Sequence, residues 1–219
     1  MTARRQSAYA RRRDDAGVTL IELLVAMSVM SILMTIVTAA VVQIHHAVNG
    51  VDSLAQTQSQ INTAFVRLDK EIRYARGVSD PALVSGDYYV EYLRSVNSVD
   101  TCVELRLRTA TSELQRRQWT KNMSPLAPGA WTTLASNVTG ATPFTVTAAD
   151  TNSLTGFRYQ RLTVALTAIV GGGSSGVNSG RAGATRQTNV TFTAMNATAS
   201  SNSTASNSAT CTEARGVSS

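Results

Sequence analysis

The sequence contains few of the residues on which enzymes and metal sites depend. Its 219 residues include two histidines, His45 and His46, and two cysteines, Cys102 and Cys211. Neighbours on a helix point about 100° apart, so the two histidines do not form one chelating pair. The cysteines show no metal-ligand spacing. The Gly/Ser run within 171–183 lacks the Lys-Ser/Thr pair of a phosphate loop. We therefore expect no catalytic residue, no metal and no cofactor.

Charge is almost absent from one long stretch. From Val18 to Ile44 there is no Lys, Arg, Asp or Pro, and the only charged side chain is Glu22. At ~1.5 Å rise per residue such a helix is about 40 Å long, which is enough to cross the hydrocarbon core of a membrane. The run is longer than the apolar core of a signal peptide, which has about 7–15 residues. The sequence therefore predicts a membrane-spanning helix over residues 18–44.

Basic residues are concentrated before this run. Residues 1–17 hold five arginines and two aspartates, a net +3, which is half of the formal +6 of the chain. The remaining charge is too small to indicate a nucleic-acid-binding protein by itself. Arginines beside a membrane helix mark its cytoplasmic side, so we expect residues 1–17 in the cytoplasm and the following domain outside it.

Glu22 requires an explanation, because a carboxylate within a membrane helix costs about 2.5–3.5 kcal/mol or more. Such a residue is a functional hypothesis by default, and its partner is expected to be a positive group in the membrane. Cleavage after Gly17 would supply one, the free α-amine of Val18, four residues before Glu22. An ordinary uncleaved signal anchor is the alternative, and it leaves Glu22 unexplained.

The order of a basic leader, Gly17, an apolar residue, Thr-Leu-Ile-Glu and a long apolar helix resembles the class III signal of type IV prepilins. The resemblance implies that a prepilin peptidase cleaves after Gly17 and N-methylates Val18. It also implies that Glu22 neutralises the N-terminus of a neighbouring subunit during filament assembly. Most members of the family have Phe or Met where Val18 stands, and Val is an apolar substitute.

After the membrane run, the apolar pattern changes to a single helical stripe. Its members are spaced three and four residues apart: Val51, Leu54, Gln58, Ile61, Phe65, Leu68, Ile72 and Ala75. This spacing predicts that the helix continues over residues 45–76 as an amphipathic half. Two charged pairs, Asp69 with Arg73 and Arg67 with Glu71, support it locally. The apolar face suits a soluble coiled coil or, in the interpretation we prefer, a β-sheet.

Alternating segments follow and predict β-strands. In Cys102–Arg108 apolar and charged residues alternate, and Thr109–Ser112 connects this strand to Glu113–Trp119 in a hairpin. Further candidate strands are Tyr88–Leu93, Phe144–Thr147, Gly156–Tyr159, Leu162–Leu166 and Thr188–Ala194. We predict an α+β fold, in which one antiparallel sheet over residues 77–196, with a Gly-rich loop at 171–183, lies on the amphipathic helix half.

The prepilin resemblance implies the same architecture, a pilin-like roll. Within that class, Phe65–Ala75 resembles the second half of the helix in minor pilins and pseudopilins of the PilW and PulJ type, the latter being GspJ-like. The segments Arg116–Trp119 and Met195–Asn196 are also similar to that group.

Residues 197–219 are almost entirely Ser, Thr, Asn and Ala, with Cys211 among them. They contain no apolar face to bury, so we predict a disordered or loosely tethered tail. A disulfide is permitted outside the cytoplasm. The alternatives are a Cys102–Cys211 bridge that attaches the tail to the sheet, two free thiols, or Cys211 pairing between chains.

The sequence supports two functional hypotheses. The first is a non-enzymatic minor pilin or pseudopilin of a type IV pilus-like or type II secretion filament. The resemblance implies as partners a prepilin peptidase, other pilin subunits through the N-terminal helix, an inner-membrane assembly platform and, before assembly, membrane lipid. The second, less favoured hypothesis is an adhesin or DNA-uptake module on the same anchor. Its basic patch on an exposed hairpin would consist of Arg106, Arg108, Arg116 and Arg117.

Overall fold

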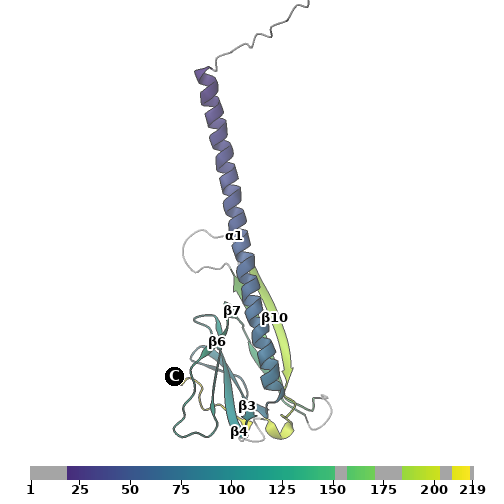
Figure 1. Ribbon diagram of the computed structural model, residues 1–219. Helices are drawn as coiled ribbons and strands as arrows, with labels where there is room; N and C mark the ends of the chain where they lie inside the picture. Colours follow the sequence, from purple (N-terminus) through teal and green to yellow (C-terminus); the bar gives the residue numbers. More distant parts are fainter. Residues whose placement is uncertain (1–18, 151–156, 171–183, 203–208, 218–219) are drawn as a thin grey trace, which may run out of the picture. The chain divides into compact units, whose positions relative to one another are not determined.

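The computed structural model describes residues 19–150, 157–170, 184–202 and 209–217. The chain divides into two compact units, Met1–Ala47 and Val48–Ser219. The helix α1 (Leu20–Arg73) contributes to both units, and every strand among the described residues belongs to the second (Figure 1). The fold class is α+β, with a long N-terminal helix and antiparallel sheets, as the sequence predicts.

The larger sheet, sheet A, has six antiparallel strands in the order β1-β3-β4-β5-β6, with β2 also paired to β3. Its strands are β1 (Gly77–Val78), β2 (Ala82–Val84), β3 (Asp87–Val96), β4 (Val99–Arg108), β5 (Glu113–Thr120) and β6 (Thr132–Ser136). Asn97 and Ser98, both at positive φ, form the two-residue turn between β3 and β4. The hairpin predicted between β4 and β5 is confirmed.

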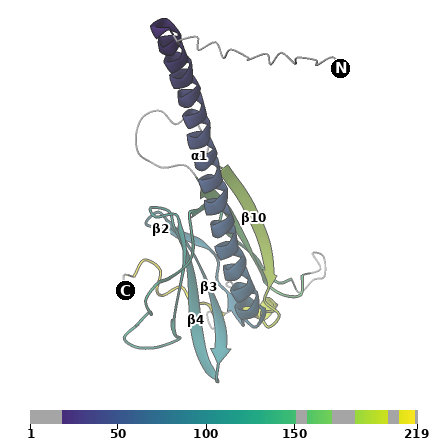
Figure 2. The same cartoon turned by 45° about the horizontal axis from the view of Figure 1, so that its top comes forward.

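The smaller sheet, sheet B, has four antiparallel strands. They are β7 (Val138–Thr139), β8 (Phe144–Thr147), β9 (Arg161–Val170) and β10 (Ala184–Thr193). β9 pairs with β10 along its whole length, and β7 and β8 both pair with its other edge. In Figures 1 and 2, β10 runs beside the second half of α1, where the Phe65 and Phe192 rings meet edge to face at 5.7 Å.

The prediction of one sheet was wrong, because the chain changes sheet at Asn137. This residue lies between β6 and β7 at a φ of 58°, a left-handed conformation that Asn adopts more readily than most residues. The Asn137 carbonyl accepts a hydrogen bond from the Ile169 amide, and the next amide in the chain, that of Val138, donates to Ser112 O, both at 2.9 Å. The change of sheet thus coincides with a residue in the left-handed conformation, and hydrophobic alternation does not report such a change.

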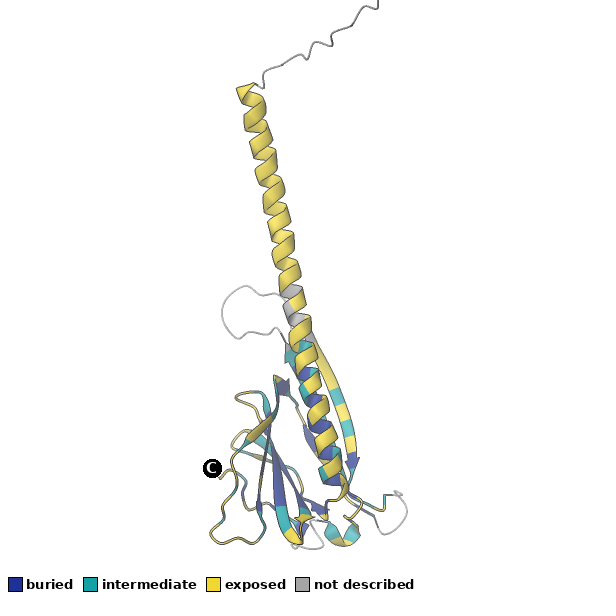
Figure 3. Ribbon diagram, viewed as in Figure 1, coloured by how far each residue is buried: buried dark blue, intermediate teal, exposed yellow. Residues whose placement is uncertain are grey.

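The second half of α1 lies on both sheets with the predicted apolar stripe. Ile61, Phe65, Leu68 and Ile72 belong to the main hydrophobic core. The core also contains strand residues of both sheets, such as Val90, Val103, Leu105, Leu162 and Leu166. Val51, at the start of the stripe, is exposed instead. Figure 3 shows the change along α1 from a fully exposed surface to one with a buried face.

A charged residue of α1, Glu71, also contacts sheet A. Its carboxylate lies 3.0 Å from the Arg116 guanidinium, 3.7 Å from that of Arg94 and 3.1 Å from that of Arg67, and it accepts a hydrogen bond from the Tyr92 hydroxyl. Burial alone would raise the pKa of Glu71, but the Tyr92 hydrogen bond and the arginine charges hold it below its ordinary value. The Arg67–Glu71 pair predicted within the helix is thus part of a larger network.

Both faces of sheet A are buried, whereas the alternation of apolar and charged residues in Cys102–Arg108 is typical of a sheet with one apolar face. The residues facing α1 alternate with a second set on the opposite face, which includes Glu91, Cys102 and Glu104. Residues 209–217, which we call the strap, lie on this opposite face. Cys211 forms a disulfide with Cys102, and Ala214 is buried in the same cluster.

The prediction of a loosely tethered tail was therefore wrong for the described part of 197–219. Besides the strap, Ala197 is fully buried in the main core, and residues Ala199–Ser201 form a short 3-10 helix. A composition of Ser, Thr, Asn and Ala does not distinguish such a segment from a disordered one.

Smaller differences concern element boundaries. α1 ends at Arg73 rather than near Arg76. The described residues of the candidate strand Gly156–Tyr159, which are 157–159, are not in a strand. The predicted strands 144–147, 162–166 and 188–194 correspond to β8, β9 and β10. The Gly-rich loop at 171–183 lies outside the described residues.

Gly77→Ala is expected to destabilise the second unit by about 1–3 kcal/mol, because a Cβ would overpack a filled site. That Cβ would lie 2.6 Å from Ala209 Cβ and 2.7 Å from the Ala209 carbonyl oxygen. Urea unfolding followed by tryptophan fluorescence measures the loss. Adding Ala209→Gly removes one of the two clashing atoms and should recover part of the stability. An unchanged midpoint in Gly77→Ala would contradict the close approach.

Candidate processing and assembly site

The N-terminal unit is described from Thr19, the residue immediately before α1. The Leu23 amide donates to Thr19 O at 3.2 Å, and the Glu22 amide donates to Thr19 Oγ1 in a long contact of 3.4 Å. Thr19 is therefore the N-cap, and Glu22 is three residues later, the spacing of a capping box. A carboxylate in the first helical turn also interacts favourably with the helix dipole. These local effects are an alternative explanation for an acidic residue at position 22.

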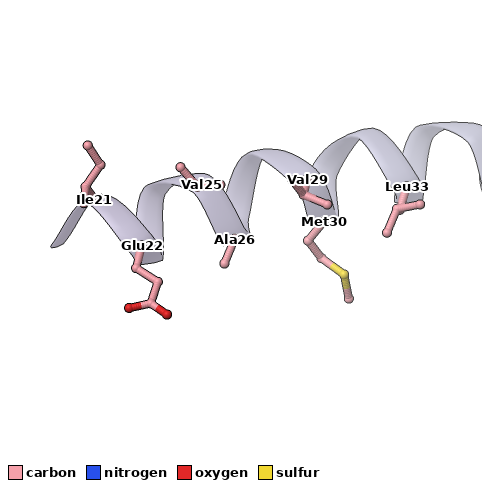
Figure 4. Close-up of a pocket in the computed structure, with 7 residues that line it drawn as sticks. All are labelled: Ile21, Glu22, Val25, Ala26, Val29, Met30 and Leu33. Carbon is pink, nitrogen blue, oxygen red and sulfur yellow. The ribbon is translucent and has the colours of Figure 1, made fainter. Parts of the chain in front are cut away.

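Glu22 lies on one face of α1 with apolar side chains. A shallow groove along this face is lined by Ile21, Glu22, Val25, Ala26, Val29, Met30 and Leu33 (Figure 4). Ala26 follows Glu22 by one helical turn, and its methyl group leaves room beside the carboxylate. Among the described residues, no ion pair is formed with Glu22. Glu22 is thus a single acidic group in an apolar helical face.

The segment Leu20–His45 is long and apolar enough to cross a membrane: an 18-residue window of it has a mean hydropathy of 2.4, and none of that window is buried within the chain. It is the one such helix among the described residues. Its exposed side chains include Leu20, Leu24, Ile32 and Ile36. Burying each large apolar side chain contributes about 1.5–3 kcal/mol. The exposed apolar surface of this helix therefore fits a membrane anchor.

The predicted site residues fall into three places. Gly17 and Val18 lie outside the described residues, so the proposed cleavage site has no described geometry. Glu22 lies in the N-terminal unit. Cys102 and Cys211, which are 109 residues apart, form a disulfide in the second unit with Cα atoms 5.7 Å apart. His45 is exposed at the end of the apolar segment.

The predicted basic patch is wrong, since its arginines are divided between two faces of sheet A. Arg116 is buried and paired with Glu71, whereas Arg117 is buried on the opposite face and paired with Glu104 at 2.5 Å. Arg106 is half-buried, with its guanidinium 4.0 Å from the centre of the Trp131 ring. Only Arg108 is exposed. Arg106, Arg116 and Arg117 each pair with a carboxylate of the chain, so the four arginines do not form one exposed basic patch.

Sequence reasoning missed the charged cluster beneath the strap. Glu91, Glu104, Arg117 and Arg215 lie together, although Arg215 is far from the others in the sequence. Strand alternation assigned Glu104 to a polar face, which is ordinarily exposed to solvent. The only signal in the sequence was Arg215, a charged residue within the polar segment 197–219. Its presence does not indicate which carboxylate it pairs with.

A comparison with protein families finds the prokaryotic N-terminal methylation motif over residues 12–38. The matched region includes Gly17, Val18, Glu22 and the first part of α1. No curated protein and no solved structure is found to be similar to the chain. The motif and the apolar helix support a type IV prepilin-like protein and fit a membrane-anchored pilin. Proteins with this motif are structural rather than enzymatic. The motif implies processing by a peptidase and assembly with other pilins.

Proposed function

We propose that the protein is a minor pilin or pseudopilin, a structural subunit of a type IV pilus-like or type II secretion filament. The observation that carries the proposal is an apolar helix, unburied within the chain, that has one carboxylate near its start and matches the methylation motif. Such a helix needs apolar surroundings, and a filament core built from the same helices of other subunits supplies them. The PilW and PulJ type remains our proposal for the subclass.

The arginines of residues 1–17 support a cytoplasmic leader, with the second unit outside the cytoplasm. In this orientation a prepilin peptidase cleaves after Gly17 and methylates the new amine of Val18. An inner-membrane assembly platform then transfers the anchored subunit from lipid into the filament. The second unit, with its two sheets and disulfide, remains outside the helical core.

Glu22 has a specific role in this proposal. Its carboxylate pairs with the Val18 α-amine of a neighbouring subunit, and the interaction is strong because few water molecules compete for either group. Unpaired in the membrane, the same carboxylate costs about 2.5–3.5 kcal/mol. Pairing removes this cost, so it favours the assembled state over the lipid-anchored one. The small side chain of Ala26 leaves space for the neighbouring N-terminus.

The proposal is tested by the intact mass of the membrane-bound protein, with and without a co-expressed prepilin peptidase. We expect loss of residues 1–17 and addition of one methyl group on Val18 in the presence of the peptidase. The same spectrum reports the Cys102–Cys211 bridge as a loss of the mass of two hydrogen atoms, relative to the two free thiols. A full-length, unmethylated chain in cells with an active peptidase would contradict the proposal.

Gly17→Ala is expected to slow cleavage at least about tenfold, equivalent to about 1.4 kcal/mol in the barrier, because the added methyl group must fit the peptidase site. Time-resolved immunoblotting of leader loss measures the effect. Gln6→Ala, also in the leader but distant from the junction, is the matched control and should be processed at the normal rate. Normal shortening of Gly17→Ala would show that the cleavage site lies elsewhere.

A further inference from the structure

The strap is fastened to sheet A by covalent and polar contacts. Beyond the Cys102–Cys211 disulfide, the Cys211 amide donates to Ser79 Oγ at 3.1 Å. The Trp119 indole donates to Glu213 Oε1 at 3.0 Å. The residues after Cys211 are held without covalent bonds to the sheet, so their docking depends on the groups they meet there.

Those groups include two buried carboxylates. Glu91 of β3 and Glu104 of β4 are directly opposite each other in the strand register, and both are fully buried. Like charges in this arrangement destabilise a sheet. Arg117, opposite Glu104 on β5, pairs with it at 2.5 Å. The sheet thus places one closely paired guanidinium beside two carboxylates.

The strap supplies the second guanidinium. Arg215 donates from Nε to Glu91 Oε1 at 2.7 Å and from a terminal nitrogen to Oε2 at 2.5 Å, and it also donates to Asp80 O. In return, Arg117 donates to the strap carbonyls of Ala214 at 2.5 Å and Val217 at 2.9 Å. When the strap is closed, Arg117 gains two carbonyl acceptors and Arg215 gains the Glu91 carboxylate. Closing also shields Glu91 from water.

One carboxylate atom is left without a partner. Glu104 Oε1 is buried and accepts no hydrogen bond within the described part of the chain. The neighbouring acid is Glu91, whose protonated form would have an O–H to donate. We propose that closing of the strap is coupled to the uptake of one proton by the Glu91–Glu104 pair, so that the strap is a pH-sensitive closure over sheet A.

The electrostatic surroundings agree with this geometry. Burial raises the pKa of Glu91 to about 7, although Arg215 lowers it, and the neighbouring Glu104 raises it further. Burial also raises the pKa of Glu104 despite the Arg117 charge. The charged groups on the surrounding elements are Asp80, Glu104, Arg106, Arg117, Glu213 and Arg215.

The pH dependence of strap closing is set by the difference between the pKa of Glu91 in the open form and in the closed form. With the strap open, Glu91 meets water and returns toward its ordinary pKa of 4.5. Between that value and about 7, the closed form holds a proton that the open form lacks. Closing is therefore most favourable at low pH and is weakened as the pH rises through about 7.

Hydrogen exchange of the full chain in detergent micelles, with the disulfide intact, tests the proposal. After correction for intrinsic rates, the opening constant of residues 212–217 should rise up to about tenfold per pH unit between about pH 5 and about pH 7. The β9–β10 hairpin, which belongs to sheet B, is the internal reference and should not follow this trend. A flat strap profile, or an equal trend in β9 and β10, would overturn the proposal.

Glu91→Gln should leave the strap closed and remove most of the pH dependence, because the amide does not titrate. Glu213→Gln is the matched control: it makes the same change on the strap itself and should retain the wild-type slope. A wild-type slope in Glu91→Gln counts against the proposal. If Glu91→Gln does not fold, the comparison of the strap with β9–β10 in the wild-type chain decides by itself.

Discussion

Glu22→Gln is expected to leave the chain fully processed but to reduce its incorporation into filaments at least about tenfold, or about 1.4 kcal/mol. The amide keeps the size of the side chain and can serve in a capping box as Glu does, so the start of α1 is preserved. It removes the negative charge that we propose pairs with the Val18 amine of a neighbour. It also lowers the cost of placing position 22 in the membrane, so the anchored form should persist.

The measurement is the ratio of processed protein in sheared or sedimented filaments to processed protein in the membrane fraction. Ser28→Ala is the matched control, since Ser28 is a polar residue of the same apolar segment and its hydroxyl donates to Val25 O within the helix. It should assemble normally. Normal assembly of Glu22→Gln would instead assign Glu22 to capping of the helix.

Glu71→Ala is expected to lower the free energy of unfolding of the second unit by about 3–5 kcal/mol, because it leaves a buried charge without its partner. Arg116 is 6% exposed and loses the carboxylate 3.0 Å away, and the buried Tyr92 hydroxyl loses its acceptor. Arg94 loses a more distant partner at 3.7 Å. Denaturant unfolding, followed by the fluorescence of Trp119 and Trp131, measures the change.

Asp69→Ala is the matched control for Glu71→Ala. Asp69 is also an acid of α1 with an arginine four residues away, but both side chains are nearly half exposed, 45% for Asp69 and 47% for Arg73. Such pairs contribute about 0.3–0.5 kcal/mol. Equal losses in the two variants would contradict the buried network. Since the pKa of Glu71 is lowered, its contribution should be present above about pH 4.5 and lost as the pH falls further.

The long elements of this protein could be predicted because their periodicity is local. The stripe through Ile61, Phe65, Leu68 and Ile72 predicted both the helix and its buried face. The Cys102–Arg108 alternation predicted a strand and its hairpin partner. The prepilin-like start was also readable from the sequence, and the methylation motif matches at residues 12–38. The cleavage and assembly roles of Gly17, Val18 and Glu22 stay predictions.

The division into two sheets and the burial of both faces of sheet A could not be predicted. The change of sheet falls at Asn137, whose left-handed conformation leaves no mark on the hydrophobic pattern. The burial of the second face depends on a strap whose composition resembles that of a disordered tail. The local sequence gives no sign of the burial of Glu104, Arg117 and Arg215. The charge of each is balanced by a partner on another element of the fold.

The sequence by itself determined the apolar N-terminal helix, its isolated Glu22 and the helical stripe that continues to Ala75, since each is a pattern within one segment. Tertiary structure alone decided which charges are buried and what covers them. The physical reason is that burying Glu91 or Arg117 is tolerable only when distant groups arrive together as partners. Hydrophobic periodicity contains no information about that pairing.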